Sequence, residues 1–259
     1  FEIASNSGYA AGNNIGIQYA IDHGFDYVWI LNNDTVVADN ALTTLLDCSQ
    51  QHPDIACFGS TLVDYSRPEK VQCAGGCRYN PLTTVRTEIY HDRDLHWVEN
   101  QQQDLVLDYV CGAAMFLQVE ALRKVGMLNQ QFFLYYEELD LAQRLKKAGY
   151  RLGWCKASIV RHRTSSSHQL NTVQQQILHY HENLSTLIYT WLHHRKLFVF
   201  AACFRLLAKI IVLPLTNRSG LIPSLIRAYY NFFKKAVNNR LSYSMPEATA
   251  SLVLKKQLR

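Results

Sequence analysis

Residues 27–31 form a run of five apolar residues, Tyr-Val-Trp-Ile-Leu, that stops abruptly at Asn32-Asn33-Asp34. A continuous apolar run of this length is typical of a strand buried on both faces of a sheet. Further segments of strand character lie at 56–63, 109–117 and 152–160, and segments with helical spacing lie at 11–23, 38–51, 119–125 and 136–148. This alternation predicts an α/β fold with a mostly parallel sheet flanked by helices, whose ligands lie beyond the carboxyl ends of the strands.

Acidic and basic residues are distributed unevenly along the chain. Residues 1–182 hold 14 Lys and Arg against 20 Asp and Glu, whereas residues 183–246 hold nine Lys and Arg and no acid. An acid-rich front suits a site that holds a cation, and a basic, apolar back suits an anionic membrane surface. Because the basic residues interrupt long apolar runs and do not cluster with Gly and Ser, membrane or core contacts are favoured over nucleic acid.

Three regions follow from these differences: a catalytic domain at 1–172, a helical membrane-associating region at 173–240 and a polar tail at 241–259. Within the first region, residues 64–104 are irregular and polar, which predicts an excursion of short strands over the sheet. The seven cysteines are scattered and odd in number, which fits reduced thiols better than a disulfide framework. No second Cys or His pair stands near Cys73 and Cys77, so a zinc site is not expected there.

Residues 197–215 are apolar except for Arg205 and Lys209, which share one helical face. A helix that lies in the membrane interface explains this pattern better than one that spans the bilayer. The alternative is that this helix and a second one at 221–237 pack on the catalytic domain as part of its core. The surface of these helices is the expected place of four histidines: His179, His181, His193 and His194.

Asn32, Asn33 and Asp34 place a carboxylate and two amides at the mouth of the predicted sheet. Mg²⁺ or Mn²⁺ prefers one or two carboxylates together with phosphate oxygens, and it neutralises the charge that grows on a leaving diphosphate. The alternative for the same residues is an Asx turn or a helix N-cap, which Asn and Asp also favour.

Three acids occupy four positions at the start of the segment 136–148: Glu137, Glu138 and Asp140. Asp140 forms an i,i+4 pair with Arg144, so a well-charged helix start explains it. Adjacent Glu137 and Glu138 repel each other unless a cation or a reacting hydroxyl uses them, and the aromatic run before them favours a raised pKa, as a general base requires. We therefore expect a catalytic role for this glutamate pair.

His162 follows the predicted strand at 152–160 and stands between Arg161 and Arg163. A lone histidine is more often structural than a ligand. Its position at a strand end makes it a candidate metal ligand, and the flanking arginines are placed to face phosphate oxygens.

The order of these motifs resembles glycosyltransferase family 2, in its bacterial rhamnosyltransferase-like branch. The resemblance covers roughly residues 5–195 and rests on Asn6-x-Gly8-x-x-x-Gly12-Asn13-x-x-Gly16, the Asn-Asn-Asp34-Thr turn, Cys111-Gly112-Ala-Ala-Met115, Phe133-x-Tyr-Tyr-Glu-Glu138-x-Asp140-Leu-x-x-Arg144 and His162. Each motif alone is weak, and the set is specific because its members occur in the family's order.

The resemblance implies a GT-A-like fold and an inverting, metal-dependent transfer of a sugar, with rhamnose as the sugar of that branch. The donor is a nucleotide-diphosphate sugar, and the acceptor is a hydroxyl of a cell-surface polysaccharide or of a lipid-linked glycan precursor. The implied place of work is the cytoplasm, peripherally on the inner face of the cell membrane.

The resemblance also assigns residues. It places Mn²⁺ or Mg²⁺ on Asp34 and His162, and the catalytic base on Glu138 beside Glu137. Asn32 stands where many members have an acid, which leaves one fewer charge on the cation. The candidate donor-binding residues are Gly12, Asn13, Asn32, Asn33, Asp34, Gly112 and Asp140.

One departure from the family is large. Its first strand, helix and second strand, which carry an acid that binds the nucleotide base, have no counterpart in the sequence. By analogy with a complete βαβ unit, about 50–70 residues are expected upstream. Two alternatives stay open: a truncated, non-catalytic remnant that only binds a membrane or a partner, and a nucleotidyltransferase, which would need a Gly-rich loop bearing Lys or Arg for its triphosphate.

Overall fold

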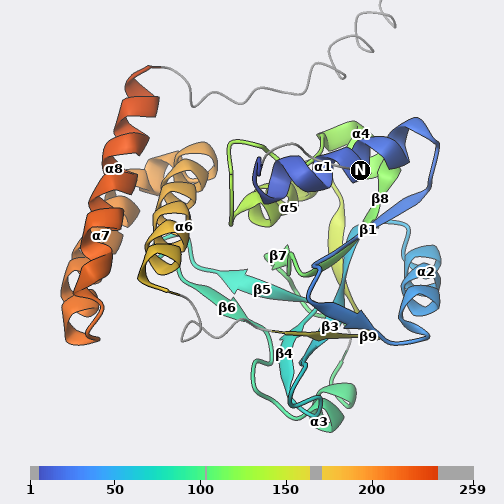
Figure 1. Cartoon of the computed structure of the whole chain (residues 1–259). Helices are drawn as coiled ribbons and strands as arrows, with labels where there is room; N and C mark the ends of the chain where they lie inside the picture. The colour runs from blue at the N-terminus through green and yellow to red at the C-terminus, as the bar shows by residue number, and fades with distance from the viewer. Residues whose placement is uncertain (1–5, 103, 164–170, 239–259) are drawn as a thin grey trace, which may run out of the picture.

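A six-stranded sheet forms the centre of the molecule (Figure 1). The computed structural model describes residues 6–102, 104–163 and 171–238, so the predicted tail at 241–259 lies outside the described residues. The strand order is β1-β8-β3-β9-β2, with β4 added beside β3. These strands are β1 (Tyr27–Leu31), β2 (Thr35–Val37), β3 (Ile55–Asp64), β4 (Val71–Ala74), β8 (Ala114–Gln118) and β9 (Arg151–His162).

Helices cover both faces of this sheet, as the α/β prediction requires (Figure 1). They are α1 (Tyr9–Asp22), α4 (Val119–Val125) and α5 (Glu137–Lys147) on one side and α2 (Ala41–Gln51) on the other. Under α2, a small core joins Leu45 to Phe58, Phe116 and Cys155. The large core on the opposite side includes Ile17, Leu122 and Leu145. The fold class predicted from the apolar strands is therefore confirmed.

The prediction that the sheet is mostly parallel is wrong for the described strands. β3 and β9 run parallel, whereas the pairs β1–β8, β3–β8, β3–β4 and β2–β9 are antiparallel. Parallel neighbours need a crossover connection, usually a helix. Between β3 and β8 the chain passes through β4 and a second small sheet, and it returns in the opposite direction. An apolar run indicates burial on both faces but carries no information about strand direction.

Residues 64–104 form the predicted excursion of short elements. A second sheet places β5 (Gly76–Tyr79) between β6 (Arg86–Glu88) and β7 (Tyr109–Val110), and α3 (Leu95–Glu99) follows β6 in the chain. The strand predicted at 109–117 is divided, because β7 joins this small sheet and β8 joins the central one. Residues 111–113 thus form the link where the two sheets meet.

The C-terminal region folds as α6 (Thr172–His193), α7 (Phe198–Leu215) and α8 (Ile222–Val237). A capping box begins α6, in which Asn171 Oδ1 accepts from the Gln174 amide at 2.9 Å and Gln174 Oε1 accepts from the Asn171 amide at 3.0 Å. The core of the sheet continues into these helices through Leu187, Ile188, Phe198 and Phe232. Hydrophobic packing is therefore continuous across the boundary predicted at residue 172, which stays a prediction.

Helix α7 has one face turned to the protein and one to solvent. Arg205 and Lys209, whose shared face suggested an interfacial helix, point inward and contact Glu182 of α6 at 3.0 and 3.7 Å. The other face exposes apolar side chains, among them Val199, Phe200, Leu207, Ile211 and Leu215. In the described part of the chain, one helical segment, Arg195–Leu215, is long and apolar enough to cross a membrane by length and composition.

Candidate active site

Asp34 and His162 lie side by side at one edge of the central sheet. Asp34 is in the turn between β1 and β2, and His162 is the last residue of β9. Thr35 pairs with His162, and the Arg163 amide donates to the Asp34 carbonyl oxygen at 3.0 Å. Asp34 Oδ1 is 3.3 Å from His162 Nε2. The two strand-end residues that the sequence singled out therefore meet.

Gln72 on β4 determines which ring nitrogen of His162 carries the proton. Its side-chain Nε2 donates to the His162 carbonyl oxygen at 2.8 Å, so its Oε1 is the atom that faces Nδ1 at 2.9 Å. Because an amide oxygen only accepts, Nδ1 carries the hydrogen, and a neutral His162 presents the lone pair of Nε2 to Asp34. Two acceptors thus face each other at 3.3 Å, and Asp34 Oδ1 has no hydrogen-bond partner among the described residues.

This pair fits a divalent cation, because a histidine oriented by an outer hydrogen bond and a carboxylate are both metal ligands. Within the described ranges, no group of three His, Cys, Asp or Glu side chains is arranged to hold a metal ion. Mg²⁺ and Mn²⁺ sites that act on nucleotides commonly use one or two carboxylates and take other ligands from phosphate and water. A metal here would likewise need donor phosphate oxygens to complete its shell.

A cavity of about 260 Å³ opens beside His162. Its polar lining includes Asp64, Gln72, Glu88, His91 and His162. Cys111 also lines it and directly precedes Gly112. The backbone N–H of Asn32 donates to the Ala113 carbonyl oxygen at 3.1 Å, which connects the β1–β2 turn to residues 111–113. The cavity therefore extends from His162, one of the two possible cation ligands, to Cys111 in the link between the two sheets.

Glu137 and Glu138 begin α5 after an unusual turn. Tyr135 and Tyr136 both adopt a left-handed backbone, with φ of 67° and 74°. Residues other than glycine cost of order 1–3 kcal/mol each in this conformation and keep it only where their surroundings hold them. The turn leaves Oε2 of each glutamate buried without a hydrogen-bond partner in the described part of the chain.

Burial raises the pKa of both glutamates. For Glu137 the charge of Glu138 is a second cause, since two adjacent carboxylates resist ionising together. The Arg86 guanidinium opposes both increases. A carboxylate with a raised pKa and an unbonded oxygen is suited to take a proton from a hydroxyl, as a general base does.

Gly112 and the start of α1 lie beside Glu138. The Tyr9 hydroxyl donates to the Gly112 carbonyl oxygen at 2.5 Å, and a Cβ added to Gly112 would be 3.9 Å from Glu138 Cδ. Gly8 precedes α1 with φ of 92°, and a Cβ there would lie 2.4 Å from the Phe133 carbonyl oxygen. Only glycine fits that close approach, which fixes α1 against the segment that leads to the glutamates.

The remaining candidate donor-binding residues lie in α1 and in the β1–β2 turn. Gly12 and Asn13 are in the first turns of α1, where Asn13 Nδ2 donates to the Tyr9 carbonyl oxygen at 3.0 Å. Asn32 is partly buried and Asn33 is exposed. Contacts of these four residues with a donor stay predictions.

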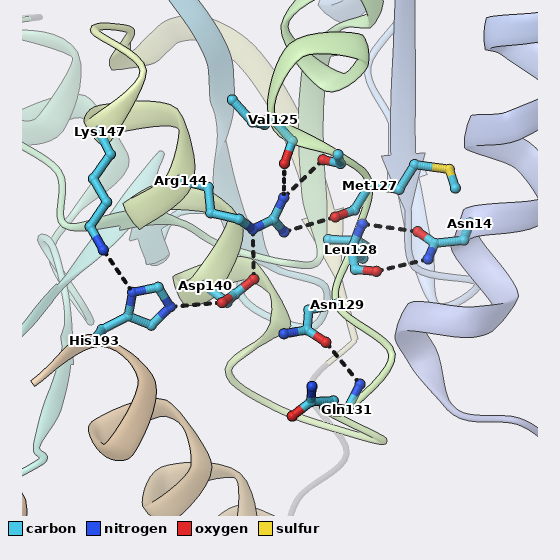
Figure 2. A network of polar contacts seen from close by, with 11 residues as sticks. Asn14, Val125, Met127, Leu128, Asn129, Gln131, Asp140, Arg144, Lys147 and His193 are labelled. Carbon is cyan, nitrogen blue, oxygen red and sulfur yellow. Dashed lines mark hydrogen bonds and ion pairs between the residues drawn. The ribbon is translucent and has the colours of Figure 1, made fainter. Parts of the chain in front are cut away.

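Asp140 makes a separate set of contacts. It is 0% exposed; its Oδ2 accepts from Arg144 Nε at 2.8 Å, and its Oδ1 is 2.7 Å from His193 Nε2 (Figure 2). Arg144 in turn donates to the carbonyl oxygens of Val125, Gly126 and Met127. In this structure the Asp140 carboxylate joins α5 to α6 and lies apart from the other candidate site residues, so its contact with a donor stays a prediction. His193, expected on the surface, is buried in the same contact.

Several residues of the site were missed at the level of the sequence. Tyr9, Gln72 and Arg86 carry no local signal, because each acquires its role from a contact with a distant segment. Asp64 did carry a local signal, because it is the last residue of the buried strand β3. Asp34 similarly lies just after β1. Asp64 Oδ1 accepts from the amides of Ser66 and Arg67 at 2.8 and 2.9 Å.

The sheet, its flanking helices and the polar turns at one edge define an α/β protein with a GT-A-like fold. The crystal structure of GalNAc-T7 with UDP, GalNAc and Mn²⁺ is similar, with a TM-score of 0.52 and 12% sequence identity over 79% of this chain and 42% of that one. The mannosyltransferase PcManGT from Pyrobaculum calidifontis, in complex with GDP-Man and Mn²⁺, has a TM-score of 0.42 and 12% identity, over 100% of this chain and 61% of that one.

Residues 4–178 match the family described as "Glycosyltransferase like family 2", and the chain belongs to that family. It is 25% identical over 154 residues to the low-salt glycan biosynthesis hexosyltransferase Agl10 of Haloferax volcanii, which is 58% of this chain and 47% of that protein. The chain thus spans about half the length of this curated relative. The family predicted from the motifs is confirmed, and the rhamnosyltransferase-like branch stays a prediction.

Proposed function

We propose that the protein is an inverting glycosyltransferase that moves a sugar from a nucleotide-diphosphate donor to a glycan hydroxyl, with Glu138 as the general base. The observation that carries the proposal is the buried Glu137–Glu138 pair, whose pKa values are raised and whose Oε2 atoms lack hydrogen-bond partners among the described residues. Glu138 lies beside Gly112, and the preceding residue, Cys111, lines the cavity that His162 also lines.

In the proposed reaction the acceptor oxygen bonds to the anomeric carbon on the face opposite the diphosphate. The bond from that carbon to the diphosphate oxygen breaks, and the acceptor proton moves to Glu138. Glu137, which is only 4% exposed, holds the proton that two adjacent carboxyls share, so that Glu138 is the ionised member. Asp34 and His162 would hold a Mn²⁺ or Mg²⁺ ion, which would supply positive charge to the leaving diphosphate.

The test of this role is Glu138→Gln, which keeps the shape of the side chain and removes the base. We expect transfer to fall by about 10²–10⁴-fold, the usual contribution of a general base, while donor binding stays near that of the wild type. The matched control is Glu120→Gln, an exposed acid in the first turn of α4, which should leave both unchanged. Near wild-type turnover in Glu138→Gln would remove Glu138 from the role.

For the donor, we propose a nucleotide-linked hexose or deoxyhexose, with rhamnose favoured by the order of the motifs. The acceptor is a cell-surface polysaccharide or a lipid-linked glycan precursor. Nucleotide release across a panel of dTDP-, UDP- and GDP-sugars with Mn²⁺ identifies the donor. Failure of every donor to support release would favour the alternative of a non-catalytic remnant.

We also propose that α7 and α8 attach the protein to the cytoplasmic face of the cell membrane. On α8 the exposed apolar residues are Ile226, Tyr230, Phe233 and Val237, and they extend the apolar surface of α7. Residues 183–246 carry no acid, and Arg227, Lys234 and Lys235 are exposed beside these side chains. Apolar side chains among exposed cations suit a surface of anionic lipids.

The open edge of β1 supports a further proposal, that additional strands pair there and complete the nucleotide-binding half. Among the described strands β1 pairs with β8 alone. An unpaired edge leaves backbone donors and acceptors ready for another strand.

A further inference from the structure

Arg86, the first residue of β6, lies between the turn that precedes the glutamates and the C-terminal helices. Its guanidinium carbon is 5.5 Å from the centre of the Tyr135 ring and 5.1 Å from that of Tyr136. On its other side, Nη2 is 3.8 Å from Glu182 Oε1 in α6. The side chain is 26% exposed, so these contacts are largely shielded from water.

The two tyrosines are the left-handed residues directly before Glu137. A guanidinium is attracted to the face of an aromatic ring, and here one guanidinium contacts both rings. Tyr136 also packs against Tyr79 and Tyr189, at ring-centre distances of 6.0 and 5.4 Å. The direction in which α5 presents its first two glutamates therefore depends on a turn that Arg86 helps to hold.

Glu182 holds Arg86 from behind and is itself fixed by α7. Arg205 Nη2 is 3.0 Å from Glu182 Oε1, and Lys209 Nζ is 3.7 Å from Oε2. Arg205 also donates to Asn183 Oδ1 and to Thr84 Oγ1, both at 2.9 Å. Burial alone raises the pKa of Glu182, but the three cations together lower it to about 2. The carboxylate is thus a permanent anion that keeps the Arg86 guanidinium in place.

We propose that Arg86 is a positioning residue for the transfer reaction: it holds the Tyr135–Tyr136 turn so that Glu138 faces the acceptor hydroxyl, and its charge favours the ionised base. This inference rests on the proposed role of Glu138. Arg86 contacts neither the donor nor the acceptor in this scheme, and it acts through the turn and through its charge.

The electrostatic part of the proposal depends on what surrounds Glu138. The titratable and charged groups that face it come from several elements: Glu137, Arg86, Tyr9, Tyr109, Tyr135 and Cys111. Arg86 is the cation of this set. Burial raises the pKa of Glu138 and the Arg86 charge lowers it, so removal of the charge raises that pKa further. The acidic limb of the rate profile should then move to higher pH, because the base must be ionised.

Two substitutions separate position from charge. Arg86→Gln removes both the stacking and the charge, and we expect kcat to fall at least about tenfold, within the roughly 100-fold that a misplaced catalytic group costs. The acidic limb of the pH–rate profile of Arg86→Gln should move to higher pH. Arg86→Lys keeps a cation but loses the planar contact with the two tyrosine rings. Its kcat should therefore fall, while the acidic limb of its pH–rate profile stays near the wild-type pH.

A readout independent of activity is amide hydrogen exchange in residues 133–140, measured on the full chain. Exchange there should rise in Arg86→Gln. The matched control is Arg78→Gln, an exposed arginine on the neighbouring strand β5, which should change neither exchange nor kinetics. Unchanged kcat and unchanged exchange in Arg86→Gln would overturn the proposal. So would an equal loss of rate at every pH combined with a lower melting temperature, since that pattern indicates a folding role alone.

Failure of the general-base assignment gives a different pattern. If Glu138→Gln keeps its turnover and its acidic limb, the base is elsewhere and the proposed function is wrong in that respect. If Glu138→Gln is inactive but Arg86→Gln behaves as the wild type, the base assignment stands and the role of Arg86 does not.

Discussion

One amide side chain orients the histidine of the candidate site. Gln72 donates to the backbone of His162 and accepts from its ring at the same time, so both ends of the amide are assigned by their partners. The ring nitrogen that faces Asp34 is left as an acceptor. Outer contacts of this kind commonly change metal affinity by 10–100-fold when they are removed.

We therefore predict that Gln72→Leu weakens Mn²⁺ binding by about 10–100-fold in the presence of a nucleoside diphosphate. Calorimetric titration of the purified full chain with Mn²⁺ measures this directly. Gln18→Leu, at a position in α1 where the amide contacts Asp22, is the control and should bind as the wild type does. Equal affinities for the two variants would show that the His162 ring needs no outer partner.

At the scale of single residues, the sequence predicted those site residues whose role shows in a local pattern. Asp34 and His162 were found because polar residues that end buried strands gather at one edge of a sheet. Glu137 and Glu138 were found because adjacent acids after aromatic residues are costly without a role. Gln72 and Arg86 were not found, because the partner of Gln72 is 90 residues away and the partners of Arg86 lie on two distant segments, the turn before α5 and helix α6.

Helix α5 is held at its start and at its middle by different means. A strained aromatic turn sets its start, and the buried Asp140–Arg144–His193 contacts join its middle to α6 and to the carbonyls of the segment after α4 (Figure 2). The candidate catalytic glutamates thus begin a helix whose orientation is fixed by the buried carboxylate of Asp140. A sequence pattern shows the acids but not which of them is buried.

Asp140→Asn should destabilise the protein by about 3–5 kcal/mol, because it leaves Arg144 buried beside a neutral partner. Urea unfolding followed by circular dichroism measures this free energy. The pKa of Asp140 is lowered, with the His193 and Arg144 contacts outweighing its burial. Its contribution is therefore present above the pKa of an unfolded Asp, near 4, and is lost as pH falls through the lower folded value. A variant as stable as Glu120→Gln at neutral pH would contradict this account.

The direction of the strands illustrates a second limit at the scale of elements. The apolar runs located β1, β3 and β9 correctly. Burial on both faces explains the run in β3, whereas in β1, at the edge of the described sheet, only Ile30 is buried. Direction depends on the path between strands, and the path from β3 to β8 runs through polar segments whose pairing partners are distant. Residue propensities and hydrophobic periodicity therefore predicted the layers of the fold, but not whether neighbouring strands of the sheet run parallel or antiparallel.

In the part of the chain that the structure describes, the outer faces of α7 and α8 form a large apolar surface. The charges that interrupt α7 in the sequence are directed to Glu182, which leaves its outer face more apolar than the sequence indicates. Helical periodicity placed Arg205 and Lys209 on one face of α7, but it does not indicate whether that face is turned to the protein or to solvent.

The double substitution Leu207→Ser and Ile211→Ser should lower binding to vesicles of anionic phospholipid at least about tenfold, since burying one large apolar side chain contributes about 1.5–3 kcal/mol. Co-sedimentation of the full chain measures the loss. Leu42→Ser, an exposed leucine on α2, is the matched control. High salt should weaken binding further by screening the exposed cations. Unaltered binding in the double variant would place the lipid contact elsewhere.

The cations around Glu182 also determine where the chain can be cut. A fragment that ends after α6 loses Arg205 and Lys209 together and uncovers the buried faces of α6 that α7 and α8 occupy. Arg86 then becomes the remaining cation beside Glu182, which in the full chain also contacts Arg205 and Lys209. The smallest working unit therefore includes α7 and α8, and the proposed membrane contact is better removed by changing the outer faces of these helices than by deleting them.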